Sequence, residues 1–144
     1  PAGVELVRCR LIGEAIERAV TQWGAIHGAF HSALVLDDRP ISALDEVSFD
    51  RVLTPKVWSA LELVSAVAEQ PMDFLAFFSS SQFMAANPGQ ASYATGSAFM
   101  DAFAHWLGRR VPYRVRTINW GYWGSVGAVA SERYRERFAA LGVH

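Results

Sequence analysis

The side chains of Lys56, Ser80 and Tyr93 are the ones in this sequence whose types and spacing could carry out chemistry together. Lys56 is the single lysine among 13 basic residues, and all the others are arginine. A lysine ammonium is a compact charge whose pKa can be tuned, whereas a guanidinium is planar and always charged. The segment from Ser80 to Tyr93 fits the end of a strand, a loop and the first turns of a helix, which can bring two hydroxyl groups together.

The chemistry that these three groups favour is the reduction of a carbonyl group. A tyrosine that gives a proton to a substrate oxygen near neutral pH needs a lowered pKa, which a nearby ammonium provides by stabilising the phenolate. A serine hydroxyl could hold the carbonyl and stabilise the charge that develops on its oxygen. The hydride would have to come from a nicotinamide, because no protein side chain donates one. The alternative is that an arginine-rich composition leaves one lysine by chance.

Composition disfavours several other classes of protein. The chain has 144 residues, of which 51% are hydrophobic and 19% charged, which is the balance of one globular domain. The 13 basic and 14 acidic residues give a net charge of -1, so a role in binding nucleic acid is disfavoured. His27 and His31 would lie about 13 Å apart in a strand, with no third ligand near them, so no metal site is predicted.

The sequence also carries expectations about location. Phe74 to Met100 is an uncharged segment long enough to cross a bilayer, but polar residues and a Pro-Gly turn interrupt it, so we expect no membrane association. No signal peptide is visible in the first residues. The single cysteine, Cys9, cannot form an internal disulfide and is predicted to be small and buried. We therefore expect a cytoplasmic protein in a reducing compartment.

Hydrophobic periodicity predicts strands that alternate with helices along the chain. The predicted strands cover residues 4–9, 26–35, 74–78 and 115–120, and the predicted helices cover residues 15–23, 47–68, 91–107 and 131–141. This order predicts an α/β fold with a parallel sheet, right-handed crossovers and helices on both faces. Ligands of such folds bind beyond the carboxyl ends of the strands, here at residues 31–32, 78–80 and 119–121.

Several stretches of the sequence, in unbroken order, carry a resemblance to a known family. They are HSALVLDD from residue 31, LTPKV from residue 53, FFSS from residue 77, PGQASYA from residue 88, FMDAFA from residue 99 and INWG from residue 118. Together they resemble the ketoreductase domains of modular polyketide synthases, which belong to the short-chain dehydrogenase/reductase superfamily. The resemblance covers residues 3–142 and implies a Rossmann-like fold.

The resemblance implies an NADPH-dependent reduction of a β-ketoacyl group, carried on an acyl carrier protein, to a β-hydroxyacyl group. The family's proton-donating tyrosine corresponds to Tyr93, its carbonyl-binding serine to Ser80 and its lysine to Lys56. A fourth catalytic position of the family, usually asparagine, falls on Ser97. Because serine is shorter than asparagine, either the proton relay is altered or the activity is weakened.

The resemblance further implies residues that bind the cofactor and the substrate. Besides Lys56 and Tyr93, the expected cofactor-binding residues are Ser32, Ala33, Trp120 and Gly121. The expected substrate-binding residues are Leu36, Asp37, Asp38, Gln90 and Tyr122. Leu36-Asp37-Asp38 resembles the fingerprint of B-type ketoreductases, and Ala85 stands where the opposite type has tryptophan. The alternative for the two aspartates is a solvated turn before Pro40.

The Gly-x-Gly-x-x-Gly motif of a dinucleotide-binding fold does not occur in the sequence. We therefore expect residues 1–144 to form only the later part of a ketoreductase domain, with its first βα units and its last strand missing. The expected partners are an acyl carrier protein and neighbouring synthase domains. The alternatives are a catalytically silent structural domain of a synthase and a free-standing reductase of a small ketone, which the B-type fingerprint disfavours.

Overall fold

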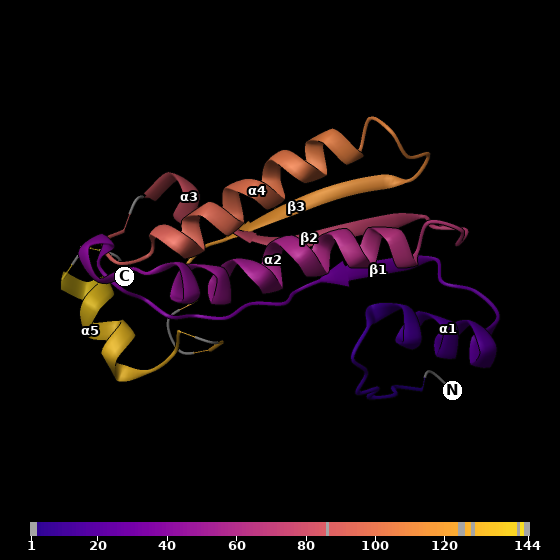
Figure 1. Ribbon diagram of the computed structural model, residues 1–144, viewed down its shortest axis with the longest axis horizontal. Coiled ribbons are helices and arrows are strands. Elements are labelled where there is room, and N and C mark those ends of the chain that lie inside the picture. Colours follow the sequence, from indigo (N-terminus) through magenta and orange to yellow (C-terminus); the bar gives the residue numbers. More distant parts are fainter. Residues whose placement is uncertain (1–2, 86, 124–125, 128, 141, 143–144) are drawn as a thin grey trace.

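The structure is a computed structural model that describes residues 3–85, 87–123, 126–127, 129–140 and 142. Strands and helices alternate along the chain, as Figure 1 shows. In order, the elements are α1 (Ile12–Trp23), β1 (Gly28–His31), the short 3-10 helix η1 (Ile41–Ala43), α2 (Glu46–Ala66), β2 (Phe74–Ser80), α3 (Gln82–Ala85), α4 (Ala91–Leu107), β3 (Arg114–Trp120) and α5 (Glu132–Ala140).

The three strands form one parallel sheet in the order β1, β2, β3, which confirms the predicted parallel arrangement. The register pairs His31 of β1 with Phe77, and Ser80 at the end of β2 with Trp120 at the end of β3. The carboxyl ends of the strands therefore meet at one edge of the sheet. The uncharged run that forms β2 is the central strand, as its continuous apolar sequence predicts.

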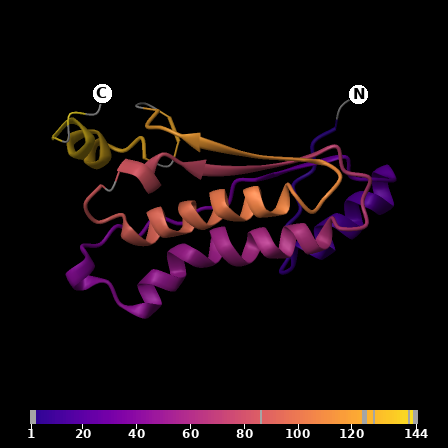
Figure 2. The ribbon, with the colours of Figure 1, turned by 90° about the horizontal axis from the view of Figure 1, so that it is seen from above.

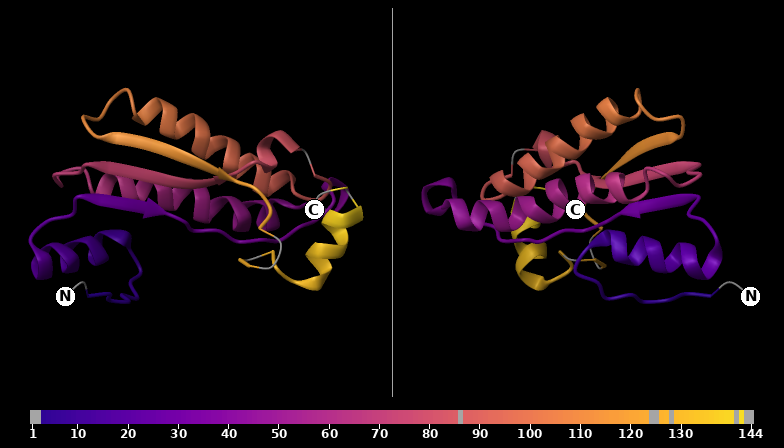
Figure 3. Two further views of the ribbon diagram at one scale, coloured as in Figure 1. Left: turned by 180° about the vertical axis from the view of Figure 1, so that it is seen from behind. Right: turned by 45° about the vertical axis from the view of Figure 1, so that its right-hand side comes forward.

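α2 and α4 lie on the same face of the sheet. Figure 2 shows both helices on one side of the strands, below them in that view, and the view from behind in Figure 3 shows the strands in front of both helices. Parallel crossovers are right-handed, and here two of them advance in the same direction, from β1 to β2 and from β2 to β3. Both helices must then fall on one side, so the expectation of helices on both faces is not met by the described residues.

The core lies between the sheet and these two helices. Phe77 of β2 and Met100 of α4 are completely buried, and Leu63 of α2 packs in the same cluster. Burial of one such side chain contributes about 1.5–3 kcal/mol, so apolar contacts hold α2 and α4 on the sheet. α2 begins at a capping box, in which the backbone N–H groups of Asp45 and Ser48 each donate to the other residue's side chain.

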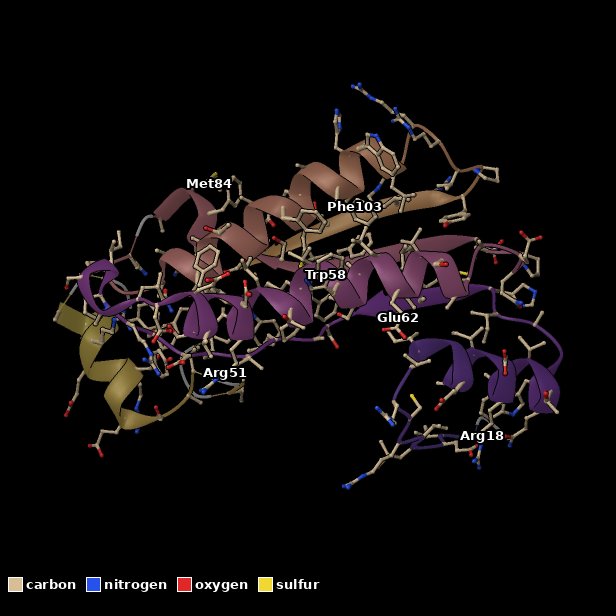
Figure 4. All side chains as sticks on the ribbon, viewed as in Figure 1. Arg18, Arg51, Trp58, Glu62, Met84 and Phe103 are labelled. Atoms are coloured by element: carbon tan, nitrogen blue, oxygen red, sulfur yellow. The ribbon has the colours of Figure 1, made fainter. Side chains whose placement is uncertain are left out.

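α1 is fastened to α2 at its amino-terminal end. The backbone N–H of Ile12 donates a hydrogen bond to the Glu62 carboxylate at 2.6 Å, and Figure 4 shows Glu62 reaching from α2 toward α1. The first N–H groups of a helix have no partner within the helix and favour a negative charge near them. The Glu62 carboxylate supplies both a hydrogen-bond acceptor and a negative charge. Leu11, at the N-cap position, makes no side-chain cap.

The predicted strand over residues 4–9 is wrong, because these residues form no strand in the structure. Val4 and Leu6 are exposed, and Cys9, predicted to be buried, is exposed as well. An alternating pattern becomes a strand only where a neighbouring strand satisfies its backbone groups. For the same reason the second predicted strand, residues 26–35, is limited to Gly28–His31, the four positions that pair with β2. The helix over residues 91–107 has the predicted limits.

Candidate active site

A cavity of about 280 Å³ lies at the carboxyl edge of the sheet. Its walls are formed by Ser32, Leu34, Leu36, Phe78, Ser80, Gln82, Gln90, Tyr93, Trp120, Gly121, Tyr122, Trp123, Val126, Gly127, Val129 and Phe138. The end of each strand contributes to these walls, together with the start of α4, the segment after β3 and α5. The cavity is therefore where a parallel sheet of this kind places a ligand.

Tyr93 and Ser80 meet in this cavity. Ser80 is the last residue of β2, and Tyr93 lies in the first turn of α4, after the Asn87-Pro88-Gly89 turn. Burial raises the pKa of the Tyr93 phenol, its hydrogen bond with Ser80 lowers that pKa, and the charge of Asp38 raises it. The expectation of a lowered pKa is thus not met, because loss of water around the phenol is the largest effect.

Lys56 lies beneath Tyr93, outside the wall of the cavity. Its side chain is 1% exposed, and its ammonium lies 4.9 Å from the centroid of the Tyr93 ring. The ammonium donates to the Phe78 carbonyl at 3.4 Å and contacts the Met100 sulfur at 3.6 Å. Burial lowers the pKa of Lys56 to about 8, and the negative charge of Asp101 acts in the opposite direction. The sheet edge therefore holds a buried cation directly under the phenol.

Gly96 of α4 makes room for the stem of Lys56. A Cβ atom at this position would lie 3.0 Å from Cδ and 3.3 Å from Cβ of Lys56, closer than side chains normally approach. A glycine inside a helix costs about 1 kcal/mol relative to alanine. The close crossing of α2 and α4 at this point explains why the helix contains one.

Ser97 is completely buried and does not line the cavity. Its hydroxyl donates to the backbone carbonyl of Tyr93 at 3.0 Å, one turn earlier in α4. Its own carbonyl accepts a hydrogen bond from Ser79 at 3.2 Å. The structure therefore brings Lys56, Ser80 and Tyr93 together but directs the hydroxyl of Ser97 into the helix.

Of the residues expected to bind the cofactor, Ser32, Trp120 and Gly121 line the cavity and Ala33 does not. Leu36, Gln90 and Tyr122, which were expected to bind the substrate, also line it. The indole Nε1 of Trp120 and the amide Oε1 of Gln90 are buried and have no hydrogen-bond partner among the described residues.

Asp37 and Asp38 are absent from the cavity wall, and both carboxylates are engaged by protein groups. Asp37 forms ion pairs with Arg39 at 3.1 Å and Arg51 at 3.3 Å. Asp38 pairs with Arg137 of α5 at 2.5 Å, and its side chain is 8% exposed. The Asp38 side chain is thus neither exposed in a solvated turn nor part of the cavity wall.

Sequence reasoning missed several residues of the wall. They are Leu34, Gln82, Val126, Gly127, Val129 and Phe138. Leu34 carries a signal, because it alternates with Ser32 and Leu36. Phe138 carries none, since its place depends on how α5 docks. Residues 124, 125 and 128, in the segment after β3, lie outside the described residues.

No helix in the described part of the chain is long and apolar enough to cross a membrane. Within the same residues, no group of three His, Cys, Asp or Glu side chains could hold a metal ion.

Comparisons with known proteins agree on one family. The family model described as "KR domain" matches residues 6–125. The polyketide synthase ThaG of Burkholderia thailandensis is 44% identical to this chain over 132 residues, which are 92% of this chain and 2% of that protein. The chain thus spans a small fraction of that relative.

Solved structures match as well. A ketoreductase domain from the bacillaene assembly line has a TM-score of 0.79 and 30% identity, over 91% of this chain and 33% of that one. A short-chain dehydrogenase/reductase of Brucella melitensis shares the fold, with a TM-score of 0.70 and 14% identity over 74% of this chain and 45% of that one. The chain therefore belongs to the KR domain family, the ketoreductase domains of polyketide synthases in the short-chain dehydrogenase/reductase superfamily.

Proposed function

We propose that this chain carries the active-site residues of a ketoreductase that uses NADPH to reduce a β-ketoacyl thioester to a β-hydroxyacyl thioester. The observation that carries the proposal is the meeting of Tyr93 and Ser80 in one cavity on the carboxyl edge of the sheet, with Lys56 directly beneath Tyr93. An acid, a hydroxyl that can bind a carbonyl oxygen and a buried cation are what this reduction requires of a protein.

The cavity suits a nicotinamide ring and an acyl chain. Its wall is mostly apolar, and the polar residues that line it include Ser32, Ser80 and Tyr93. Ser32, Trp120 and Gly121 would hold the nicotinamide at the strand ends, with Lys56 and Tyr93 beside it, and Ala33 would adjoin them. When bound, the cofactor supplies the hydride to the carbonyl carbon. The preference for NADPH over NADH rests on the family resemblance.

Each side chain then has one task. Ser80 donates a hydrogen bond to the carbonyl oxygen and stabilises the charge that develops on it. Tyr93, kept protonated by its raised pKa, gives its proton to that oxygen as the hydride adds, which leaves an alcohol and a phenolate. The Lys56 ammonium stabilises the phenolate until solvent returns a proton. Ser97 supports this arrangement by holding the carbonyl of Tyr93.

The proposed substrate is presented by an acyl carrier protein, within a synthase that supplies neighbouring domains. Leu36, Gln90 and Tyr122 would lie against the acyl chain, since all three belong to the cavity wall. The fingerprint Leu36-Asp37-Asp38, with Ala85, supports B-type stereochemistry and hence a D-configured alcohol. Chiral chromatography of the product tests this, and an L-configured alcohol would contradict it.

The experiment that tests the proposal measures NADPH oxidation by the full polypeptide with a β-ketoacyl N-acetylcysteamine thioester as substrate. We expect turnover that yields the β-hydroxyacyl thioester. A simple ketone without a thioester serves as control, because a free-standing short-chain reductase would reduce it equally well. Lack of turnover with every β-ketothioester would contradict the proposal.

One observation favours a second candidate, a catalytically silent structural domain of a synthase. Ser97 replaces the family's usual asparagine, and its hydroxyl is bonded within α4 and does not reach the cavity. A silent domain would still bind its neighbours but would fail to turn over. The same assay, carried out with Ser97→Asn beside the native protein, separates the two candidates.

A further inference from the structure

The Asp38 carboxylate joins three parts of the chain that are far apart in the sequence. Its Oδ2 atom accepts hydrogen bonds from the Gln90 amide at 3.0 Å, the Tyr134 phenol at 3.2 Å and the Arg137 guanidinium at 2.5 Å. A carboxylate that is 8% exposed needs such donors, because an unpaired buried charge is strongly destabilising. We call these four residues the Asp38 clamp.

The second arm of Arg137 extends the clamp to the turn before α4. Its Nη2 donates to the carbonyl of Pro88, and the backbone N–H of Arg39 donates to the carbonyl of Gly89 at 2.9 Å. Gly89 has a φ of +77°, and a Cβ atom there would lie 3.4 Å from Arg137 Nη2. A residue other than glycine would be strained at this φ, although its Cβ atom would make only an ordinary contact with the guanidinium. α5, the loop after β1 and the turn before α4 thus meet at one ion pair.

Two residues of the clamp, Arg137 and Gln90, connect it to the candidate active site. Phe138 follows Arg137 in α5, lines the cavity and lies 4.6 Å from the Tyr122 ring, centroid to centroid. Gln90 is the N-cap residue of α4, the helix whose first turn carries Tyr93. The position of α5 therefore sets one wall of the cavity, and the same carboxylate contacts the residue that begins the helix of the proposed acid.

We propose that Asp38 is a positioning residue, whose clamp holds α5 across the cavity and so shapes the wall against which the acyl chain lies. The proposal rests on the proposed function for the identity of its substrate, an acyl thioester. Asp38 then influences substrate binding through α5 and does not touch the substrate. Its neighbour Asp37 pairs with Arg39 and Arg51, which lie outside α5, so the two aspartates of the fingerprint have different tasks.

The first test is amide hydrogen exchange of residues 132–140 in the full polypeptide. Asp38→Asn keeps an oxygen acceptor but removes the charge, and Arg137→Met removes the guanidinium. Loss of a hydrogen bond to a charged group corresponds to exchange that is roughly tenfold to a hundredfold faster, and we expect this of each variant. The double variant should exchange little faster than either single one, because the two residues form one interaction.

Matched controls isolate the clamp. Asp37→Asn removes the adjacent carboxylate, and Arg135→Met removes an exposed guanidinium from the same helix. Both should leave exchange in α5 unchanged. Exchange in α4 reports whether each variant is folded, and Arg137→Met provides the result if Asp38→Asn does not fold. Unchanged exchange in the Arg137→Met protein, or full additivity of the two single variants, would overturn the proposal.

The second test separates this proposal from the proposed function. For a β-ketoacyl N-acetylcysteamine thioester, we expect Arg137→Met to raise KM about tenfold and to change kcat less than about threefold. A purely structural role would lower the amount of folded protein without changing KM. Loosened exchange with an unchanged KM would refute the role in substrate binding. If the native protein reduces no thioester, the proposed function fails, while the exchange result still decides whether the clamp holds α5.

Discussion

The Lys56 ammonium and the Tyr93 ring lie 4.9 Å apart, centroid to nitrogen, although they come from different helices. A cation over an aromatic ring is attracted to it, and a cation near a phenol favours the phenolate. Burial has the opposite effect on the phenol and is the larger one, so the pKa of Tyr93 is raised. In the proposed reduction, Tyr93 is consequently the protonated acid, and it becomes a stabilised anion only after its proton has moved.

Tyr93→Phe should abolish most of the reduction. The substitution removes the acid that neutralises the forming alkoxide and keeps the ring over Lys56, so kcat should fall by about 10²–10⁴ with NADPH affinity within a few-fold. Steady-state kinetics and isothermal titration measure the two quantities. Tyr113→Phe, which removes a phenol that does not line the cavity, is the matched control and should leave kcat unchanged. Native turnover in the Tyr93→Phe protein would contradict the assignment.

Ser80→Ala and Ser97→Ala should have very different effects on the rate. The Ser80 hydroxyl lines the cavity and hydrogen-bonds with Tyr93, so its loss should lower kcat by about 10²–10³, as for other groups that stabilise an oxyanion. The Ser97 hydroxyl donates to a backbone carbonyl, so its loss should change kcat less than about threefold. An equal loss in both variants would mean that Ser97 takes part in the chemistry directly.

The elements that could be predicted from the sequence are those with strong local signals. α4 has the predicted limits because a Pro-Gly turn precedes it and Gly108 follows it. β2 is an apolar run too short for a helix of the core and too hydrophobic for an exposed strand. Residues 4–9 have the alternation of a strand but form none, because alternation does not supply a neighbouring strand with which to pair.

The parts of the site that could not be predicted depend on tertiary contacts. Arg137 and Asp38 meet across most of the chain, and no local pattern relates them. The family resemblance placed Lys56 near Tyr93, yet the pKa of the phenol is controlled by how much water the final packing removes. The positions of chemical groups were thus accessible from motifs, whereas their electrostatics required the structure.

His31 should make the stability of the protein sensitive to acid. Burial, with the positive charge of Lys56, lowers the pKa of His31 to about 4, and its ring hydrogen-bonds to the Ser59 hydroxyl. Between about pH 6.5 and pH 4 the unfolded state binds the additional proton, so the free energy of unfolding falls as the pH falls through this window. His31→Gln should remove up to about 3 kcal/mol of that fall.

Urea denaturation of both proteins across this pH range measures the difference. His27→Gln, which changes an exposed histidine at the start of the same segment, is the control and should behave as the native protein does. Identical pH dependence of the native and His31→Gln proteins would mean that the His31 ring does not remain neutral in the folded protein.

Lys56→Met should stabilise the protein while removing its activity. The pKa of Lys56 is about 8 in the folded protein against an ordinary value of 10.5, so folding disfavours the charged form. This penalty is fully present below about pH 8 and fades as the pH rises through about 10.5, above which the amine is neutral in both states. Methionine has a similar length and no charge, so the free energy of unfolding should increase by about 1–3 kcal/mol near pH 7. The gain should shrink toward zero near pH 10.5.

Lys56→Arg gives the opposite test, because a guanidinium stays charged at every pH and is too large for the space beside Gly96. It should be less stable than the native protein throughout. Denaturant titrations near pH 7, 9 and 10.5 compare the three proteins, and a Lys56→Met protein less stable than the native one near pH 7 would show that the contacts of the ammonium outweigh the cost of its burial.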